Sequence, residues 1–207
     1  MIRRFILLFV VLLFAPVRLP AQTAETPARE QEEYSVYSAL ITFLYARSDR
    51  RLMVIADPAC CGALSLGYSR YPYKESAPVS KEAYEDFRSR NAKHRVLERK
   101  FNLPIPYVIA ERRELINLVA GPENDFSNFH EKYPDAQGFI TLSRVGFNQN
   151  GDEAFVFSCE IFDRAFQPCR FLITTRNAGC EACWFVSLSK KNGIWSVKSM
   201  AFHDTPA

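Results

Sequence analysis

Glycine is scarce in this sequence, and the motifs that depend on glycine are missing. The 207 residues include only eight glycines, and these form no phosphate-binding loop, no dinucleotide fingerprint and no G-x-S-x-G hydrolase elbow. Repeats and low-complexity tracts are absent as well, and aromatic residues make up 14% of the chain. These features exclude a disordered chain. A Ser/His/Asp site assembled from distant residues stays open.

Acidic residues are absent from residues 1–21. This segment has a basic start, an apolar stretch over residues 5–17 and the ending Leu19-Pro20-Ala21. That order is typical of a secretory signal peptide, cleaved after Ala21 or Ala24. The apolar stretch is shorter than the about 20 residues that a membrane-spanning helix needs. We therefore expect an exported protein, periplasmic or extracellular, with no stable membrane anchor after cleavage.

Excess charge of one sign is also lacking once this segment is removed. The whole chain has 26 basic and 23 acidic residues, and residues 1–21 contain three of the arginines. The mature chain would carry 23 charges of each sign. A neutral domain has no overall electrostatic attraction to nucleic acid or to anionic lipid, so neither is expected as a partner.

The mature chain has the length of one domain. Residues 22–32 are polar and predict a flexible N-terminus, followed by a single domain over residues 33–203. Apolar residues with helical spacing predict helices over residues 33–47, 80–100 and 123–133. Residues 112–119 fit either a strand or a short helix.

The last third of the chain has the composition of β-structure. Strands are expected over residues 52–55, 107–110, 139–147, 153–162, 170–175, 183–190 and 194–202. The dipeptides Asn150-Gly151 and Asn192-Gly193 predict hairpin turns. Helices first and strands last indicate an α+β fold, with N-terminal helices packed on one face of a C-terminal antiparallel meander sheet.

Six cysteines lie in the mature part, and export predicts that they form disulfides. They are Cys60, Cys61, Cys159, Cys169, Cys180 and Cys183, which allow 15 pairings, including a bridge from loop to sheet. The C-x-x-C motif of Cys180 and Cys183 leads into a predicted strand rather than a helix, so a structural disulfide is favoured over a redox centre. A zinc site would need a second such pair, which is absent.

Five polar residues near apolar segments are candidates for lining a binding pocket: Asp57, Asp86, Asn91, His94 and Arg144. Their alternative roles are structural, with Asp57 capping a loop, Asp86 in the first turns of its helix and Arg144 paired on the sheet. His94 is expected on the buried face of the helix over residues 80–100. No histidine has metal-ligand spacing, so no catalytic residue, metal or cofactor is predicted.

A resemblance adds to this interpretation. The segment Tyr133-Pro134-Asp135-Ala136-Gln137-Gly138-Phe139-Ile140-Thr141-Leu142-Ser143-Arg144-Val145-Gly146-Phe147-Asn148 and the later aromatic Asn-Gly hairpin resemble an uncharacterised family of exported bacterial proteins. The resemblance implies export and an α+β fold, and it carries over no catalytic residue. Helices followed by a curved sheet are also similar to the cone-shaped nuclear-transport-factor and cystatin-like folds.

These observations leave three hypotheses of function. The first is an exported, disulfide-stabilised, non-catalytic binding or interaction module with an unknown ligand or protein partner. The second is a secreted hydrolase or isomerase with a cone-shaped pocket that uses Asp57, His94 and Arg144. The third is a thiol–disulfide factor that acts through Cys180 and Cys183.

Overall fold

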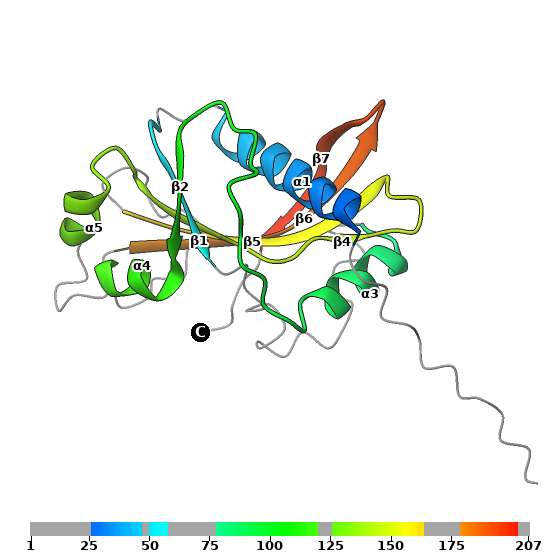
Figure 1. Cartoon of the computed structure of the whole chain (residues 1–207), viewed down its shortest axis with the longest axis horizontal. Helices are drawn as coiled ribbons and strands as arrows, with labels where there is room; N and C mark the ends of the chain where they lie inside the picture. The colour runs from blue at the N-terminus through cyan, green and yellow to red at the C-terminus, as the bar shows by residue number, and fades with distance from the viewer. Residues whose placement is uncertain (1–25, 47–49, 58–77, 120–125, 164–178, 203–207) are drawn as a thin grey trace, which may run out of the picture.

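The computed structural model of the chain describes residues 26–46, 50–57, 78–119, 126–163 and 179–202, with side chains from residue 182 onward in the last range. Helices precede most of the strands, which confirms the α+β class (Figure 1). The elements are α1 (Pro27–Tyr45), β1 (Met53–Asp57), α3 (Lys81–Arg90), β2 (Tyr107–Glu111), α4 (Arg112–Val119), α5 (Ser127–Lys132), β3 (Gly138–Leu142), β4 (Gly146–Phe147), β5 (Glu153–Asp163), β6 (Gly179–Lys191) and β7 (Ile194–Phe202).

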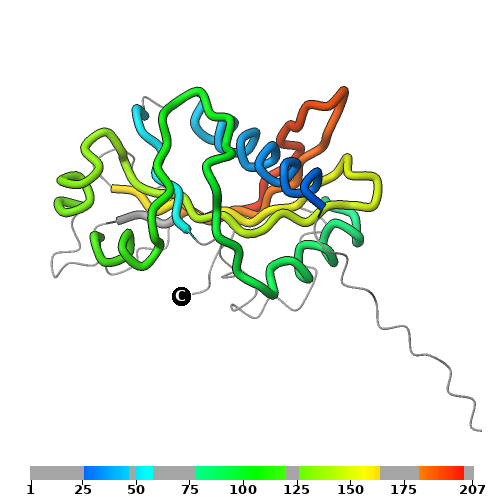
Figure 2. Tube along the Cα trace, viewed as in Figure 1, coloured from blue at the N-terminus to red at the C-terminus, as the bar shows by residue number. Residues whose placement is uncertain are grey.

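One mixed sheet contains all the described strands. Its order is β2-β1-β3-β5-β6-β7, and β4 pairs with β5 beside this path. The predicted antiparallel meander runs from β3 to β7, and β1 extends it by pairing in parallel with both β2 and β3. The trace shows this extension at the end of the sheet away from the β6–β7 hairpin (Figure 2). The carboxyl ends of β1 and β2 therefore lie side by side.

Helix α1 begins at Pro27, so the prediction of a flexible segment is wrong for residues 27–32. Thr26 caps the helix by accepting a hydrogen bond from the Arg29 backbone N–H, and proline at the first position has the backbone angle that a helix needs. Salt bridges stabilise the helical residues that precede the predicted start at residue 33, because Glu30 pairs with Lys100 and Glu32 pairs with Lys190. The polar composition of residues 27–32 therefore reflects ion pairing across the surface of the fold.

Helices cover both faces of the sheet, which corrects the expectation of packing on one face. In β5, Ala154 and Val156 belong to the core with α1, whereas Phe155 and Phe157 pack with α3 on the opposite face. Helices α4 and α5 pack with Phe139 on that second face, over the parallel end of the sheet. Figure 1 shows α1 and α3 on opposite sides of the strands. The central strand therefore buries apolar residues on both faces, and its sequence is apolar throughout residues 154–157.

Helix α3 starts at its predicted cap, Ser80, but ends ten residues before the predicted end at residue 100. Its C-cap is Asn91, whose side-chain amide and backbone N–H both donate to the Phe87 carbonyl in the last turn of the helix. Residues beyond the cap bind side chains from other elements instead. The backbone N–H groups of Glu98 and Asn102 donate to Tyr34 and Ser38 of α1.

The two predicted hairpin turns are confirmed. Gly151 has φ +69° in the turn between β4 and β5, and Asn192 and Gly193 have φ of 51° and 80° between β6 and β7. Consecutive positive φ values match the right-handed twist of a two-residue hairpin. Residues 112–119 form a helix, and the strand expected over residues 170–175 lies outside the described part of the chain. None of the described helices combines the length and the apolar character needed to cross a membrane.

Candidate functional site

Two of the predicted pocket residues, Asp86 and Asn91, bind backbone groups, and Arg144 provides one of the backbone segments that they bind. The Asn91 amide donates to the Arg144 carbonyl at 2.9 Å, and its oxygen accepts from the Arg144 N–H at 2.8 Å. Asp86 accepts from the Phe147 N–H at 2.8 Å and from the Arg29 guanidinium at 2.7 Å. Asp86 and Asn91 therefore attach α3 to the connection between β3 and β4 and to β4 itself.

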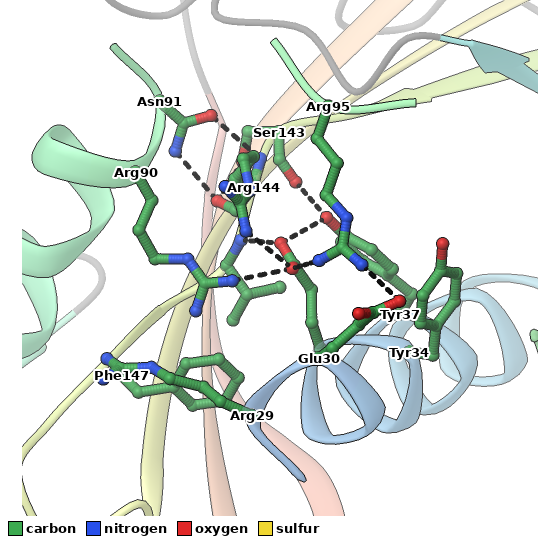
Figure 3. A network of polar contacts seen from close by, with 12 residues as sticks. Arg29, Glu30, Tyr34, Tyr37, Arg90, Asn91, Arg95, Ser143, Arg144 and Phe147 are labelled. Carbon is green, nitrogen blue, oxygen red and sulfur yellow. Dashed lines mark hydrogen bonds and ion pairs between the residues drawn. The ribbon is translucent and has the colours of Figure 1, made fainter. Parts of the chain in front are cut away.

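The centre of this region is a residue that the sequence did not single out. Glu33 of α1 is 0% exposed, and its Oε2 atom lies 2.7 Å from Arg90, 2.7 Å from Arg95 and 3.2 Å from Arg144. Figure 3 shows these three arginines converging above α1. Its Oε1 atom accepts from the Val145 N–H at 2.9 Å. Tyr37, one helical turn along α1, donates to the same oxygen at 2.9 Å. We call Glu33, Tyr37, Arg90, Arg95 and Arg144 the Glu33 cluster.

Electrostatics hold this carboxyl in its charged form. Burial by itself raises the pKa of Glu33, but the charges of Arg90 and Arg144 and the Val145 N–H outweigh burial, so the pKa lies below its usual value. Burial and the charge of Glu33 raise the pKa of Tyr37 well above its usual value. At neutral pH Glu33 is therefore an anion and Tyr37 a neutral donor, which fits a fixed structural role.

The Glu33 cluster joins four parts of the fold: α1, the end of α3, the segment after α3, and the connection between β3 and β4. Arg95 carries the network outward by pairing with Glu30 at 2.6 Å. The sequence pattern does indicate that Glu33 is buried, since Glu33, Tyr37 and Leu40 are spaced four and three residues apart on the buried stripe of α1. A charged residue on such a stripe needs a buried partner.

A second buried ion pair lies near the C-terminal end of α1. Arg50 pairs with Glu160 of β5 and stacks over the Tyr45 ring at 4.3 Å. Burial raises the pKa of Glu160 in spite of the opposing charge of Arg50. The Ser158 hydroxyl and the Arg50 Nε atom are buried without a hydrogen-bond partner in the described part of the chain. We give this cluster no ligand.

The remaining candidate, Asp57, lines an open pocket. The pocket has a volume of about 300 Å³ and is lined by Asp57, Glu111, Arg112, Arg113 and Ile116. Asp57 and Glu111 are partners in the register of the parallel strands β1 and β2, so both acids stand at the carboxyl ends of neighbouring strands. Helix α4 follows β2 without a loop, and its first two residues are the arginines. We call these five residues the strand-end pocket.

Two charged side chains of the strand-end pocket have no partner among the residues that the structure describes. Glu111 and Arg113 are exposed, and within the described residues neither makes a hydrogen bond or an ion pair. Asp57 is held in place, because its Oδ1 atom accepts from the Leu97 N–H at 2.7 Å. The sequence indicated Asp57 and missed Glu111, Arg112 and Arg113, because the parallel pairing of β1 with β2 is a long-range contact.

The histidines have other environments. His94 is exposed and follows the end of α3, so its predicted place on a buried helical face is wrong. His130 of α5 contacts Asp163 at the end of β5, with Nε2 and Oδ2 3.0 Å apart. Arg144 is committed to Glu33 and Asp57 to the Leu97 N–H. These contacts give no support to a shared active site of Asp57, His94 and Arg144.

One disulfide is present among the described residues, and it joins Cys159 to Cys183. These cysteines face each other in the register of β5 and β6, with Cα atoms 4.1 Å apart. Cys183 therefore pairs with Cys159 rather than with Cys180, and β6 runs through both positions of the C-x-x-C motif. The sulfurs of Cys60, Cys61, Cys169 and Cys180 lie outside the described part. No group of three metal-ligating side chains occurs in the part that the structure describes.

No family model, no curated protein and no solved structure matches the chain. The resemblance to a family of exported bacterial proteins stays a prediction.

Proposed function

We propose that the chain is an exported, disulfide-stabilised binding module without catalytic activity, and that its ligand site is the strand-end pocket. The observation that carries the proposal is the contrast between two sets of charges. The carboxylate of Glu33 is buried and paired with arginines of the fold. Glu111 and Arg113, in contrast, border an open pocket and have no partner in the described chain.

The position of the pocket supports the proposal. Ligands of open α/β sheets bind outside the carboxyl ends of parallel strands, where the side chains that end neighbouring strands converge. The pocket lies at the ends of β1 and β2. This likeness to α/β proteins is one of geometry and does not by itself name a ligand.

The test is a ligand screen with the oxidised, mature protein labelled with ¹⁵N. We expect some compounds of a small-molecule library to shift the amide signals of Asp57 and of residues 111–116. The variant Ile116→Arg, which places a long side chain at the pocket, should abolish these shifts. Ile194→Arg is the matched control, because Ile194 is 72% exposed on the β6–β7 hairpin. A library without any compound that shifts these amides, or compounds that bind Ile116→Arg equally well, would refute the proposal.

A further inference from the structure

The strand-end pocket presents charges of both signs. Asp57 and Glu111 supply two carboxylates, and Arg112 and Arg113 supply two guanidinium groups. A ligand with only negative charge would meet the two carboxylates, and a ligand with only positive charge would meet the two guanidinium groups. Like charges brought together on binding cost affinity. The pocket therefore favours a ligand that itself has both signs.

Resting on the proposed binding function, we infer that the strand-end pocket binds a small aliphatic zwitterion, of the class of a free α-amino acid. The groups that recognise it are Glu111 and Arg113, the two charges of the pocket without partners in the described ranges. The Glu111 carboxylate accepts hydrogen bonds from the ligand ammonium, and the Arg113 guanidinium donates to the ligand carboxylate. Asp57, fixed by the Leu97 N–H, stands beside Glu111 and adds to the negative side.

The size and the apolar part of the pocket fit this class. A volume of about 300 Å³ is at the lower end of the range for small-molecule sites, which run from about 300 to 1,000 Å³. Ile116 lies one helical turn beyond Arg112 on α4 and is 40% exposed at the pocket. An aliphatic side chain on the ligand would cover this exposed surface and gain from its removal from water.

The order of charges along the chain also sets the orientation of the bound ligand. Helix α4 begins at Arg112, and the first turn of a helix has a positive electrostatic potential. This potential adds to the arginine charges on one side of the pocket. The ligand carboxylate therefore lies against Arg113 in the first turn of α4, and its ammonium lies against Glu111 and Asp57.

Three probes with one carbon skeleton test the inference: L-leucine, 4-methylpentanoate without the ammonium, and isopentylamine without the carboxylate. Each is titrated into the ¹⁵N-labelled protein, and affinity is read from the amides of residues 111–116. Because charge-assisted hydrogen bonds are strong, we expect the affinity for L-leucine to be at least about tenfold higher than the affinity for either analogue. Equal affinity of one analogue would overturn the inference.

Two variants separate the roles of the charged groups. Arg113→Gln should weaken L-leucine about tenfold and should not weaken isopentylamine, because it removes a like charge for the amine. Glu111→Gln should weaken L-leucine and should not weaken 4-methylpentanoate, for the same reason with the signs exchanged. Arg88→Gln on the exposed face of α3 is the matched control and should change nothing. If only other library compounds shift the pocket amides, the zwitterion is wrong and the binding function stands. If no compound shifts them, the binding function itself fails.

Discussion

At the scale of single residues, the buried carboxylate of Glu33 is the centre of the polar contacts that join the segments of the fold. Three arginines from three separate segments approach one of its oxygens, and two hydrogen bonds reach the other. Each arginine is mostly buried, and Glu33 compensates its charge, with Arg95 paired to Glu30 as well. Removing one partner of a buried ion pair costs more than the pair contributes, because the remaining charge stays in the interior.

Glu33→Gln should lower the free energy of unfolding at pH 7 by about 3 to 5 kcal/mol. Glutamine keeps the size of the side chain but removes the negative charge that faces Arg90 and Arg144, whereas Arg95 keeps its pair with Glu30. Urea unfolding followed by circular dichroism measures the change. Glu85→Gln is the control, because Glu85 forms only an exposed pair with Lys81 within α3 and should cost less than about 0.5 kcal/mol. Equal stability of the two variants would contradict this account.

The contribution of Glu33 should also depend on pH. Its pKa is lower in the folded chain than the value of 4.5 expected for an unfolded chain. Protons therefore bind more readily to the unfolded state, so the stabilisation is full above about pH 4.5 and disappears as pH falls through the folded pKa. The difference in stability between wild type and Glu33→Gln should shrink from pH 6 to pH 3.

Comparing wild type with Glu33→Gln at each pH separates the contribution of Glu33 to stability from that of Glu160, because both proteins contain Glu160. Burial raises the pKa of Glu160, so that residue lowers stability as pH rises above 4.5. A gap between wild type and Glu33→Gln that stays constant down to pH 3 would show that the folded pKa of Glu33 is not depressed.

At the scale of elements, the contact between α3 and β4 is unusually close. A Cβ atom at Gly146 would lie 2.2 Å from the Ala83 carbonyl oxygen and 2.4 Å from the Phe87 backbone nitrogen. Glycine is required here because the helix backbone occupies the space of a side chain. The approach lets Asp86 bind the Phe147 N–H and Asn91 bind Arg144.

Gly146→Ala should destabilise the fold by about 3 kcal/mol, since α3 must move away from the sheet. Thermal unfolding followed by calorimetry measures the loss. Gly151→Ala is the matched control: space is open around Gly151, and only its positive φ opposes alanine, at about 1 to 2 kcal/mol. A smaller loss at Gly146 than at Gly151 would show that α3 adjusts to the added methyl group without strain.

At the scale of the whole molecule, the Cys159–Cys183 disulfide fixes the two central strands of the meander to each other. It spans 24 residues of sequence and lies in the core between the sheet and α3. A covalent link of this length removes conformational freedom from the unfolded chain. The link is compatible with the predicted export, because disulfides persist in oxidising compartments.

Replacing both cysteines, Cys159→Ala with Cys183→Ala, should cost about 3 to 4 kcal/mol of stability. The backbone register of β5 and β6 should survive, because eleven residue pairs join these strands. Urea unfolding of the oxidised wild type and of the double variant gives the difference. Peptide mapping without reductant should recover the linked pair, and a map that joins Cys183 to Cys180 instead would be incompatible with this structure.

Local signals predicted most elements, and long-range contacts explain the failures. Ser80 located the start of α3, and the two Asn-Gly turns located the hairpins, because each depends on a few neighbouring residues. The end of α3 was missed because Asn91 binds Arg144, 53 residues away. The start of α1 was missed because the partners of its acidic residues lie far along the chain.

The sequence by itself determined the α+β class, the hairpins and the apolar residues available for a core, since periodicity and turn chemistry are local properties. Only the tertiary structure decided that Glu33 meets three arginines, that β1 and β2 extend the sheet in parallel, and that Asp57 stands beside Glu111. The physical reason is the same in each case. Pairs of charges and of strands gain free energy only when folding brings distant segments together, and a single sequence does not record which segments those are.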